Sequence, residues 1–230
     1  MSEGYAVGHF IGYQSDGIVQ DQSEVFSHIN SEGDLLQPDA APGDIKFLDS
    51  NGDGVIDSDD ITDIGNPWPK HIFGLSSNID YKNFYISAVF NAQIGHDIFR
   101  TYERSDVTFS NYQSFWMDRW TPSAPSEVLP RLTSTDPNNN QRPSDFYVEK
   151  GNFLRVRNLQ IGWTLPKRWI DKAQMQEVKV YFTANNLLTI TNYRGFDPDI
   201  GTSGWILDTG IDKGFYPNNR SIGAGINVTL

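Results

Sequence analysis

The stretch Ile72-Phe-Gly-Leu-Ser-Ser-Asn-Ile-Asp-Tyr81, Lys82-Asn83, Phe84-Tyr-Ile-Ser-Ala-Val-Phe-Asn-Ala-Gln-Ile-Gly95 decides the fold. Apolar residues alternate with small or polar ones through both halves, and Val89 is the one apolar exception. Period-two alternation over this length is typical of β-strands. Only Lys82-Asn83 interrupts the pattern, so the sequence predicts two antiparallel strands joined by a tight turn.

The length and the two faces of this hairpin point to a membrane. Each strand runs for about ten residues, which exceeds the common five or six and suits a tilted crossing of a bilayer. One face is apolar with aromatic residues near its ends, and the other carries Ser, Asn, Asp, Gln and Gly. That arrangement matches an outer-membrane barrel, with lipid on one side and a polar lumen on the other. A soluble antiparallel sheet with one wet face would show the same pattern.

Composition narrows the classes of function. The 230 residues are 38% hydrophobic and 13% aromatic, which excludes a disordered chain, and their apolar runs are too short for a membrane-spanning helix. The net charge of −11 argues against nucleic acid, and the lack of cysteine excludes disulfides and zinc thiolate sites. The four histidines have no zinc spacing, and nucleophile elbow and P-loop are missing, so we expect no enzyme. No signal peptide is recognisable in the first residues, Met1-Ser2-Glu3-Gly4. Either the protein is cytoplasmic or its true N-terminus is missing, and we expect the second.

The sharpest motif runs from Asp49 to Asp60 and follows the EF-hand loop pattern. The positions that would supply oxygen ligands are Asp49, Asn51, Asp53, the Val55 carbonyl, Asp57 and Asp60. Gly54 stands where the pattern needs a sharp turn, whereas Asp60 replaces the usual bidentate Glu and predicts weaker binding. We expect one structural Ca²⁺; an acidic loop of Asx-turns without metal is the alternative.

Further strands and loops extend the pattern beyond the hairpin. Strands are predicted at residues 5–13, 153–165, 178–190 and 221–230, and the connections alternate between long and short as in outer-membrane barrels. Long extracellular loops are expected at 14–71, 96–152 and 191–220. The aromatic residues of a short amphipathic helix over residues 112–120 would stack sugars, bind a partner or pack the loop onto its neighbours. Residues 134–144 are expected to form a flexible loop tip. The side chains expected on the lipid-facing side are Phe84, Ile86, Phe90, Ile161, Trp163, Val180, Phe182, Ile226 and Val228.

Several segments together resemble the C-terminal part of the SusC/RagA family of TonB-dependent outer-membrane transporters. They are Gly43-Asp-Ile-Lys-Phe-Leu-Asp-Ser-Asn-Gly-Asp-Gly54, Ile64-Gly-Asn-Pro-Trp-Pro69, Tyr147-Val-Glu-Lys-Gly-Asn-Phe-Leu-Arg-Val-Arg-Asn-Leu159, Thr183-Ala-Asn-Asn-Leu-Leu-Thr-Ile-Thr191 and Tyr216-Pro-Asn-Asn-Arg-Ser221. The resemblance covers nearly the whole chain. The sequence departs from the family in lacking the plug and the TonB box, and in ending on Leu230 where Phe is more frequent.

The resemblance implies an all-β fold, a transmembrane barrel segment of about six strands from a barrel of about 22, open as a fragment. Residues 1–230 would be the C-terminal portion of the receptor barrel in the bacterial outer membrane, with the plug domain and N-terminal part absent. The implied function is import of glycans or oligopeptides. The implied partners are a SusD-like surface lipoprotein, outer-membrane lipid and the TonB complex, the last through the missing N-terminal region. The rival hypothesis is a soluble, calcium-stabilised β-sandwich for adhesion or glycan binding.

Overall fold

The computed structural model describes residues 4–103, 111–200 and 204–230, in which strands predominate. Met1 to Glu3, on which the signal-peptide expectation rests, lie outside them. Among the described residues no helix is both long and apolar enough to cross a membrane. The strands are β1 (Phe10–Gly12), β2 (Ser15–Ile18), β3 (Ile45–Phe47), β4 (Thr62–Gly65), β5 (His71–Tyr81), β6 (Phe84–Ile94), β7 (Asp97–Arg100), β8 (Val148–Lys150), β9 (Phe153–Thr164), β10 (Glu177–Thr191), β11 (Ile211–Asp212) and β12 (Ser221–Thr229). The helices are α1 (Gln22–Ser27), α2 (Lys167–Ile170) and short 3₁₀ turns at Ser58–Asp60, Ser114–Asp118, Asp145–Tyr147, Asp171–Ala173 and Ile206–Asp208.

The chain divides into two compact units. The loop unit comprises Met1–Pro67, Ile98–Glu149 and Thr202–Lys213. The sheet unit comprises Trp68–Asp97, Lys150–Gly201 and Gly214–Leu230. The long strands all belong to the sheet unit, which therefore carries the fold expected from the hairpin.

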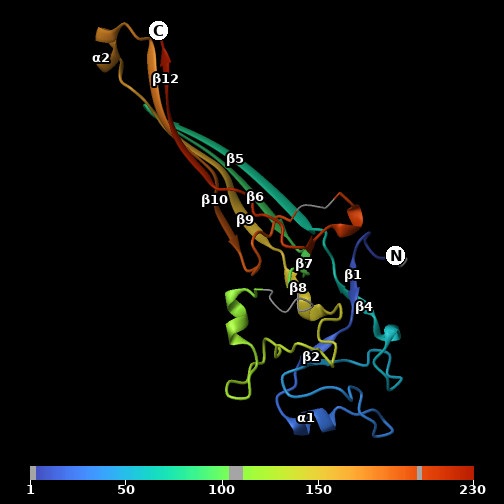
Figure 1. The fold of residues 1–230 in the computed structure, drawn as a ribbon. Coiled ribbons are helices and arrows are strands. Elements are labelled where there is room, and N and C mark those ends of the chain that lie inside the picture. Colours follow the sequence, from blue (N-terminus) through green and yellow to red (C-terminus); the bar gives the residue numbers. More distant parts are fainter. Residues whose placement is uncertain (1–3, 104–110, 201–203) are drawn as a thin grey trace. The chain divides into compact units, whose positions relative to one another are not determined.

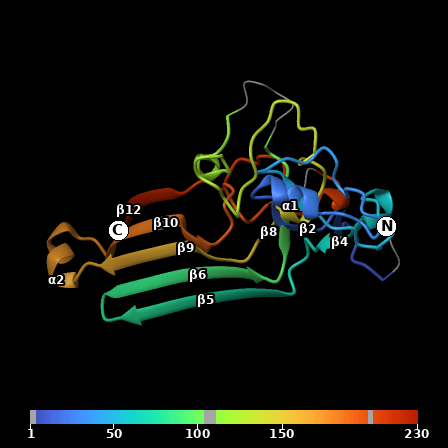
Figure 2. The same cartoon turned by 90° about the horizontal axis from the view of Figure 1, so that it is seen from below.

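The sheet unit is one antiparallel sheet of five strands in the order β12-β10-β9-β6-β5 (Figures 1 and 2). The predicted hairpin forms as expected, with Tyr81 opposite Phe84 at the turn and His71 opposite Ile94 at the far end. Lys82 in the turn has φ of 56°, a left-handed conformation that a tight hairpin requires. The strands predicted at 153–165, 178–190 and 221–230 are confirmed as β9, β10 and β12.

The register sorts side chains into rows that run across all five strands. Residues directly opposite each other in a sheet share a face. Two rows of one face are Tyr81, Phe84, Trp163, Val180 and Ile226, and Ile79, Ile86, Ile161, Phe182 and Ala224. Two rows of the other are Asp80, Tyr85, Gly162, Tyr181 and Gly225, and Asn78, Ser87, Gln160, Thr183 and Gly223. We call these the apolar face and the polar face.

The apolar face is open. Ile79 is 58% exposed, Phe182 40% and Ile226 66%, values that a core between two stacked sheets would not allow. The nine side chains expected to face lipid belong to the alternating set that forms this face. The expectation of a barrel segment is therefore confirmed. A β-sandwich would require this face to be buried against a second sheet, and the face is exposed.

A β-bulge in β9 changes the face of the sheet on which the first residues of this strand lie. The register between β6 and β9 shifts between Val89 and Phe90, and Arg157 is the extra residue on β9. Without the shift, Arg155 would lie on the apolar face. With it, Arg155 lies opposite Asn91 and Thr189 on the polar face, and Leu154 and Val156 replace it on the apolar face. Bulges re-aim side chains in this way.

The sheet holds five long strands and not the expected six. The segment predicted at residues 5–13 forms only the three-residue β1, which pairs with β4 in the loop unit. Gly8 has φ of 75° and the His9 N–H donates to the Ala6 carbonyl, so the chain turns where a strand would have to stay extended. Glycine and aromatic content alone did not distinguish these two outcomes.

The loop unit consists of short strand pairs around a small core. β1 pairs with β4, β2 with β3, and β7 lies between β11 and β8. Ile45 and Phe47 of β3 are fully buried, with Val19, Ile98 and Leu129 nearly so. Residues of two long connections, 14–71 and 96–152, meet in this core, which holds the described segments around it in place.

Two expectations for the long connections change in the structure. The helix expected over residues 112–120 is a 3₁₀ helix, Ser114–Asp118, whose Trp116 is buried, which favours packing over sugar stacking. Residues 134–144 were expected to be a flexible tip, yet Asn138, Asn140 and Ser144 are buried. The side-chain amides of Asn138 and Asn140 donate to Ile45 and Asp44, which are distant in sequence, and local composition does not reveal such partners.

Candidate functional site

The acidic loop at residues 49–60 is a set of Asx-turns closed by carboxylates. Asp49 accepts from the N–H groups of Gly52 (2.7 Å) and Gly54 (2.8 Å), and Gly54 has the positive φ, 91°, that the turn needs. Asp60 is fully buried and accepts from Ser50 (2.7 Å), Asn51 (3.3 Å) and Asp57 (2.8 Å). The loop is thus pre-formed by its own backbone.

The predicted calcium ligands are only partly brought together. Asn51, Asp53 and Asp57 are exposed, and the Asn51 amide donates to Asp53 (2.9 Å). Val55 donates its N–H to Asp53 (3.0 Å). Nowhere in the described residues do three or more His, Cys, Asp or Glu side chains form a group that could hold a metal ion. The calcium site therefore stays a prediction.

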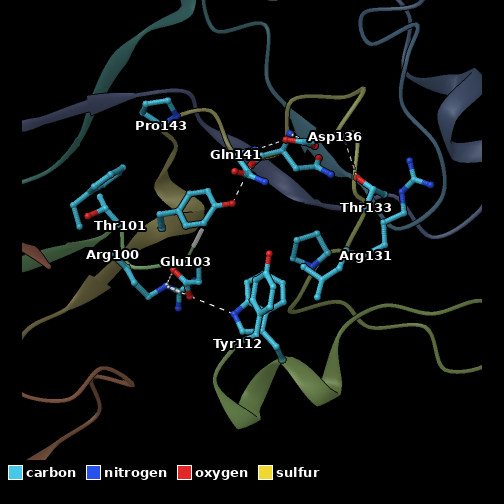
Figure 3. Close-up of a pocket in the computed structure, with 15 residues that line it drawn as sticks. Arg100, Thr101, Glu103, Tyr112, Arg131, Thr133, Asp136, Gln141 and Pro143 are labelled. Carbon is cyan, nitrogen blue, oxygen red and sulfur yellow. Dashed lines mark hydrogen bonds and ion pairs between the residues drawn. The ribbon is translucent and has the colours of Figure 1, made fainter. Parts of the chain in front are cut away.

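A cavity of about 240 Å³ lies in the loop unit (Figure 3). Figure 3 shows Arg100 and Glu103 on one side of it and Arg131 and Thr133 on the other, with Tyr112 below them. Ligand pockets for small molecules are usually larger, about 300–1,000 Å³.

A buried charge cluster borders this cavity. The Arg100 side chain is fully buried; it donates through Nε to Glu103 (3.1 Å) and through Nη1 to Glu149. Its Nη2 is buried without a hydrogen-bond partner among the described residues. Burial raises the pKa of Glu103, and it also raises the pKa of Tyr147. Sequence reasoning missed this cluster, because no spacing links residues about fifty positions apart.

Asp44 is the centre of a second network that the sequence did not reveal. It is fully buried and receives a bidentate contact from Arg131, Nε at 2.6 Å and Nη2 at 2.9 Å. Asn140 donates to it at 2.8 Å and accepts the N–H of Ile45 at 2.9 Å. The Asp44 carboxylate can be buried because the Arg131 guanidinium neutralises its charge and the Asn140 amide donates a hydrogen bond to it. The network fixes residues 134–144 onto β3.

The sheet unit has its own buried ion cluster, on the polar face. Arg155 is 1% exposed; it contacts Asp197 and, at 3.2 Å, Asp199, and its Nε donates to Thr189 at 2.9 Å. Burial acts to raise the pKa of Asp197, but the N–H groups of Asn218 and Asp199 and the Arg155 guanidinium outweigh it, and the pKa lies below its usual value. The cluster fastens the connection after β10 to the sheet.

These features define a class of protein. An antiparallel sheet whose long strands expose one continuous apolar face, and whose other face is polar, is a segment of a transmembrane β-barrel wall. The order β12-β10-β9-β6-β5 leaves β12 and β5 as edges, so the described strands form an open portion of such a wall.

Comparison with known proteins places this class more narrowly. No protein-family model matches the chain. It is 30% identical over 234 residues to the TonB-dependent receptor P3 of Formosa agariphila, covering 99% of the chain and 22% of the relative. It is 32% identical over 243 residues to the TonB-dependent receptor P26 of the same organism, covering 99% and 23%. It is 26% identical over 185 residues to the TonB-dependent receptor SusC of Bacteroides thetaiotaomicron, covering 79% and 17%.

Solved structures agree at the level of the fold. The RagAB peptide importer in its "open-open" state matches with a TM-score of 0.67 and 20% identity over 96% of this chain and 22% of that one. The chain belongs to the SusC/RagA family of TonB-dependent receptors. It spans a quarter or less of the length of the curated relatives it matches.

Proposed function

We propose that this chain forms the C-terminal barrel portion of a TonB-dependent nutrient importer in the bacterial outer membrane. The observation that carries the proposal is the apolar face, which is continuous across five strands and open to its surroundings. Such a face requires lipid around it. The role is structural within a transporter rather than catalytic, in keeping with relatives named as receptors.

The loop unit supplies the second part of this proposal. Its core and its buried networks around Arg100 and Asp44 hold long connections in one conformation, as a docking surface requires. We assign this surface to a SusD-like lipoprotein, with a glycan or oligopeptide as the cargo and the TonB complex acting through a region outside this chain. RagAB, one of the matching structures, is a peptide importer.

Copurification tests the assignment. The intact receptor that carries this chain, solubilised from outer membranes, should retain a SusD-like lipoprotein in near-equal amount. Replacing residues 14–67 by a Gly/Ser linker should release it while the receptor stays in the membrane. Deleting the receptor should then abolish growth on either glycans or oligopeptides, which names the cargo. Purification without a lipoprotein, together with unchanged growth, would contradict the proposal.

We propose in addition that the loop at residues 49–60 binds one structural Ca²⁺. The EF-hand spacing supports this, as do the turn closed by Asp49 and the exposed side chains of Asn51, Asp53 and Asp57. The span contains five aspartates, whose mutual repulsion a cation would relieve. An affinity of about 10⁻⁴–10⁻³ M suffices outside the cell.

Calorimetry with calcium on the folded receptor decides this point. Binding heat should disappear in Asp49→Ala and in Asp53→Ala. Asp59→Ala is the matched control, because it removes one negative charge from the same loop outside the ligand set. Equal losses in all three variants would indicate diffuse charge attraction, and no heat at millimolar calcium would leave only an acidic loop.

A further inference from the structure

The connection between β9 and β10 is unlike the other short connection of the sheet. Lys82-Asn83 joins β5 and β6 directly, whereas residues 165–176 contain α2 and a following 3₁₀ turn. Lys167, Arg168 and Lys172 are all exposed there, against one carboxylate, Asp171. Three cations in six residues form a local basic patch on a chain whose net charge is −11.

Aromatic stacking fixes this basic turn against the apolar face. Trp169 of α2 packs edge-on against Trp163, with ring centroids 5.4 Å apart and planes at 88°. Trp163 in turn stacks on Phe84 at 5.9 Å, and both belong to the row of the apolar face nearest the turns. Ile170 is buried, which anchors the helix, whereas Trp169 remains 55% exposed. In Figure 1, α2 lies at the end of the sheet beside the C-terminus.

This combination matches the chemistry of a membrane surface. Tryptophan favours the interface, where an amphipathic ring lies at headgroup level. Lysine and arginine close to it extend their charged ends into the headgroup layer. Clustered Lys and Arg next to a membrane-embedded surface attract anionic lipids. The inference rests on the proposed function, in which lipid covers the apolar face. The basic patch adjoins that face through the Trp169–Trp163 contact, so a bilayer fits it better than a soluble protein.

We propose that α2 and the 3₁₀ turn that follows it bind the anionic phospholipid headgroups of the membrane leaflet at this end of the sheet. Trp169 and Ile170 hold the helix at the boundary, while Lys167, Arg168 and Lys172 select negative charge. The contact fixes the depth of the barrel wall in the bilayer at the end where the strands are joined by short turns.

The preference of the protein for anionic over zwitterionic lipid tests the proposed contact between the basic residues and the headgroups. The intact receptor that carries this chain is reconstituted in phosphatidylcholine vesicles containing spin-labelled phosphatidylglycerol or spin-labelled phosphatidylcholine, and the relative association of the two lipids is read from their motionally restricted fractions. Each cation near an anionic surface strengthens attraction about fivefold. We expect a several-fold preference for phosphatidylglycerol, falling by at least about threefold in the Lys167→Gln, Arg168→Gln, Lys172→Gln variant.

Two controls separate this contact from bulk charge and from misfolding. Lys46→Gln, Lys150→Gln, Lys213→Gln removes the same charge from three ion-paired lysines on other elements and should keep the preference. Lys167→Arg, Lys172→Arg keeps the charge and should keep it too. If the α2 variant retains the wild-type preference with unchanged β-sheet circular dichroism, the proposal is wrong. An equal loss in the control variant overturns it as well.

Discussion

At the scale of single residues, Arg155 shows how the polar face of the sheet can hold a buried charge. It is 1% exposed and is held by two carboxylates and a threonine hydroxyl, while a bulge keeps it off the apolar face. Its neighbour Arg157 shares Asp199 at 2.8 Å but leaves 44% of its side chain exposed. Two arginines two positions apart therefore differ mainly in burial.

Substituting these arginines tests the difference. Arg155→Gln should lower the free energy of unfolding by about 3 kcal/mol, because it leaves Asp197 and Asp199 without their buried partner. Arg157→Gln should cost less than about 1 kcal/mol, because an exposed pair is screened by solvent. Urea unfolding of the detergent-folded chain, followed by tryptophan fluorescence, measures both. Equal costs would show that burial does not set the strength of this cluster.

At the scale of elements, tyrosines and glycines alternate across the polar face. Tyr85 lies opposite Gly162 and Tyr181 lies opposite Gly225, in one row. A Cβ on Gly162 would come within 2.0 Å of the Tyr85 ring, and one on Gly225 within 2.5 Å of the Tyr181 ring. The rings cover the glycine backbone, which is the way sheets compensate for strand glycines.

Substituting alanine for these glycines should separate the effect of side-chain packing from that of the intrinsic β-strand propensity. Gly162→Ala should destabilise the sheet by about 1–3 kcal/mol, because the added methyl overlaps the Tyr85 ring. Gly223→Ala is the control in the neighbouring row, where the nearest atom is 3.5 Å away, so its effect should be small or stabilising. Thermal unfolding in detergent gives both values. A Gly162→Ala variant as stable as Gly223→Ala would mean that the tyrosine ring moves aside freely.

At the scale of the whole molecule, a loop unit and a sheet unit alternate along one chain. The sheet unit leaves β5 and β12 as edges, which in a complete barrel would pair with strands outside this chain. The loop unit gathers three separate segments of sequence around one core. Barrel wall and loop surface are thus encoded in alternating stretches, as expected for strands that run back and forth across a bilayer.

The environment of the two faces provides the test at this scale. The chain lacks cysteine, so single cysteines can carry spin labels without interference. In vesicles, labels at Phe182 and Ile226 should collide more with oxygen than with a water-soluble nickel complex, because oxygen concentrates in lipid. Labels at the adjacent Thr183 and Asn227 should show the reverse. Water-like accessibility at all four positions would refute a lipid-covered face.

The sequence by itself determined the long strands, their order along the chain and the face of most of their side chains, whereas the face of Arg155 and its neighbours depends on the bulge in β9. Alternation is a local property, so the hairpin at residues 71–94 and the strands β9, β10 and β12 could be read directly from it. The acidic loop was predicted from a second local signal, the EF-hand spacing, and the structure shows the Asx-turns that the sequence left as the alternative, closed by the loop's own carboxylates. The strand predicted at residues 5–13 forms only the three residues of β1, and it does not join the sheet of long strands. So short a segment carries too little pattern to predict its partner strand.

Tertiary structure alone decided the contacts that join distant segments. The Arg131–Asp44 pair spans 87 residues and the Gln37–Asn138 hydrogen bond spans 101. Because composition does not reveal such contacts, it predicted a flexible tip at residues 134–144, whereas the structure holds these residues in place. The position of Trp169 against Trp163 likewise depends on how a short helix folds back onto its strand. Such contacts follow from packing and desolvation, which depend on which groups meet in space and leave no periodic trace in the sequence.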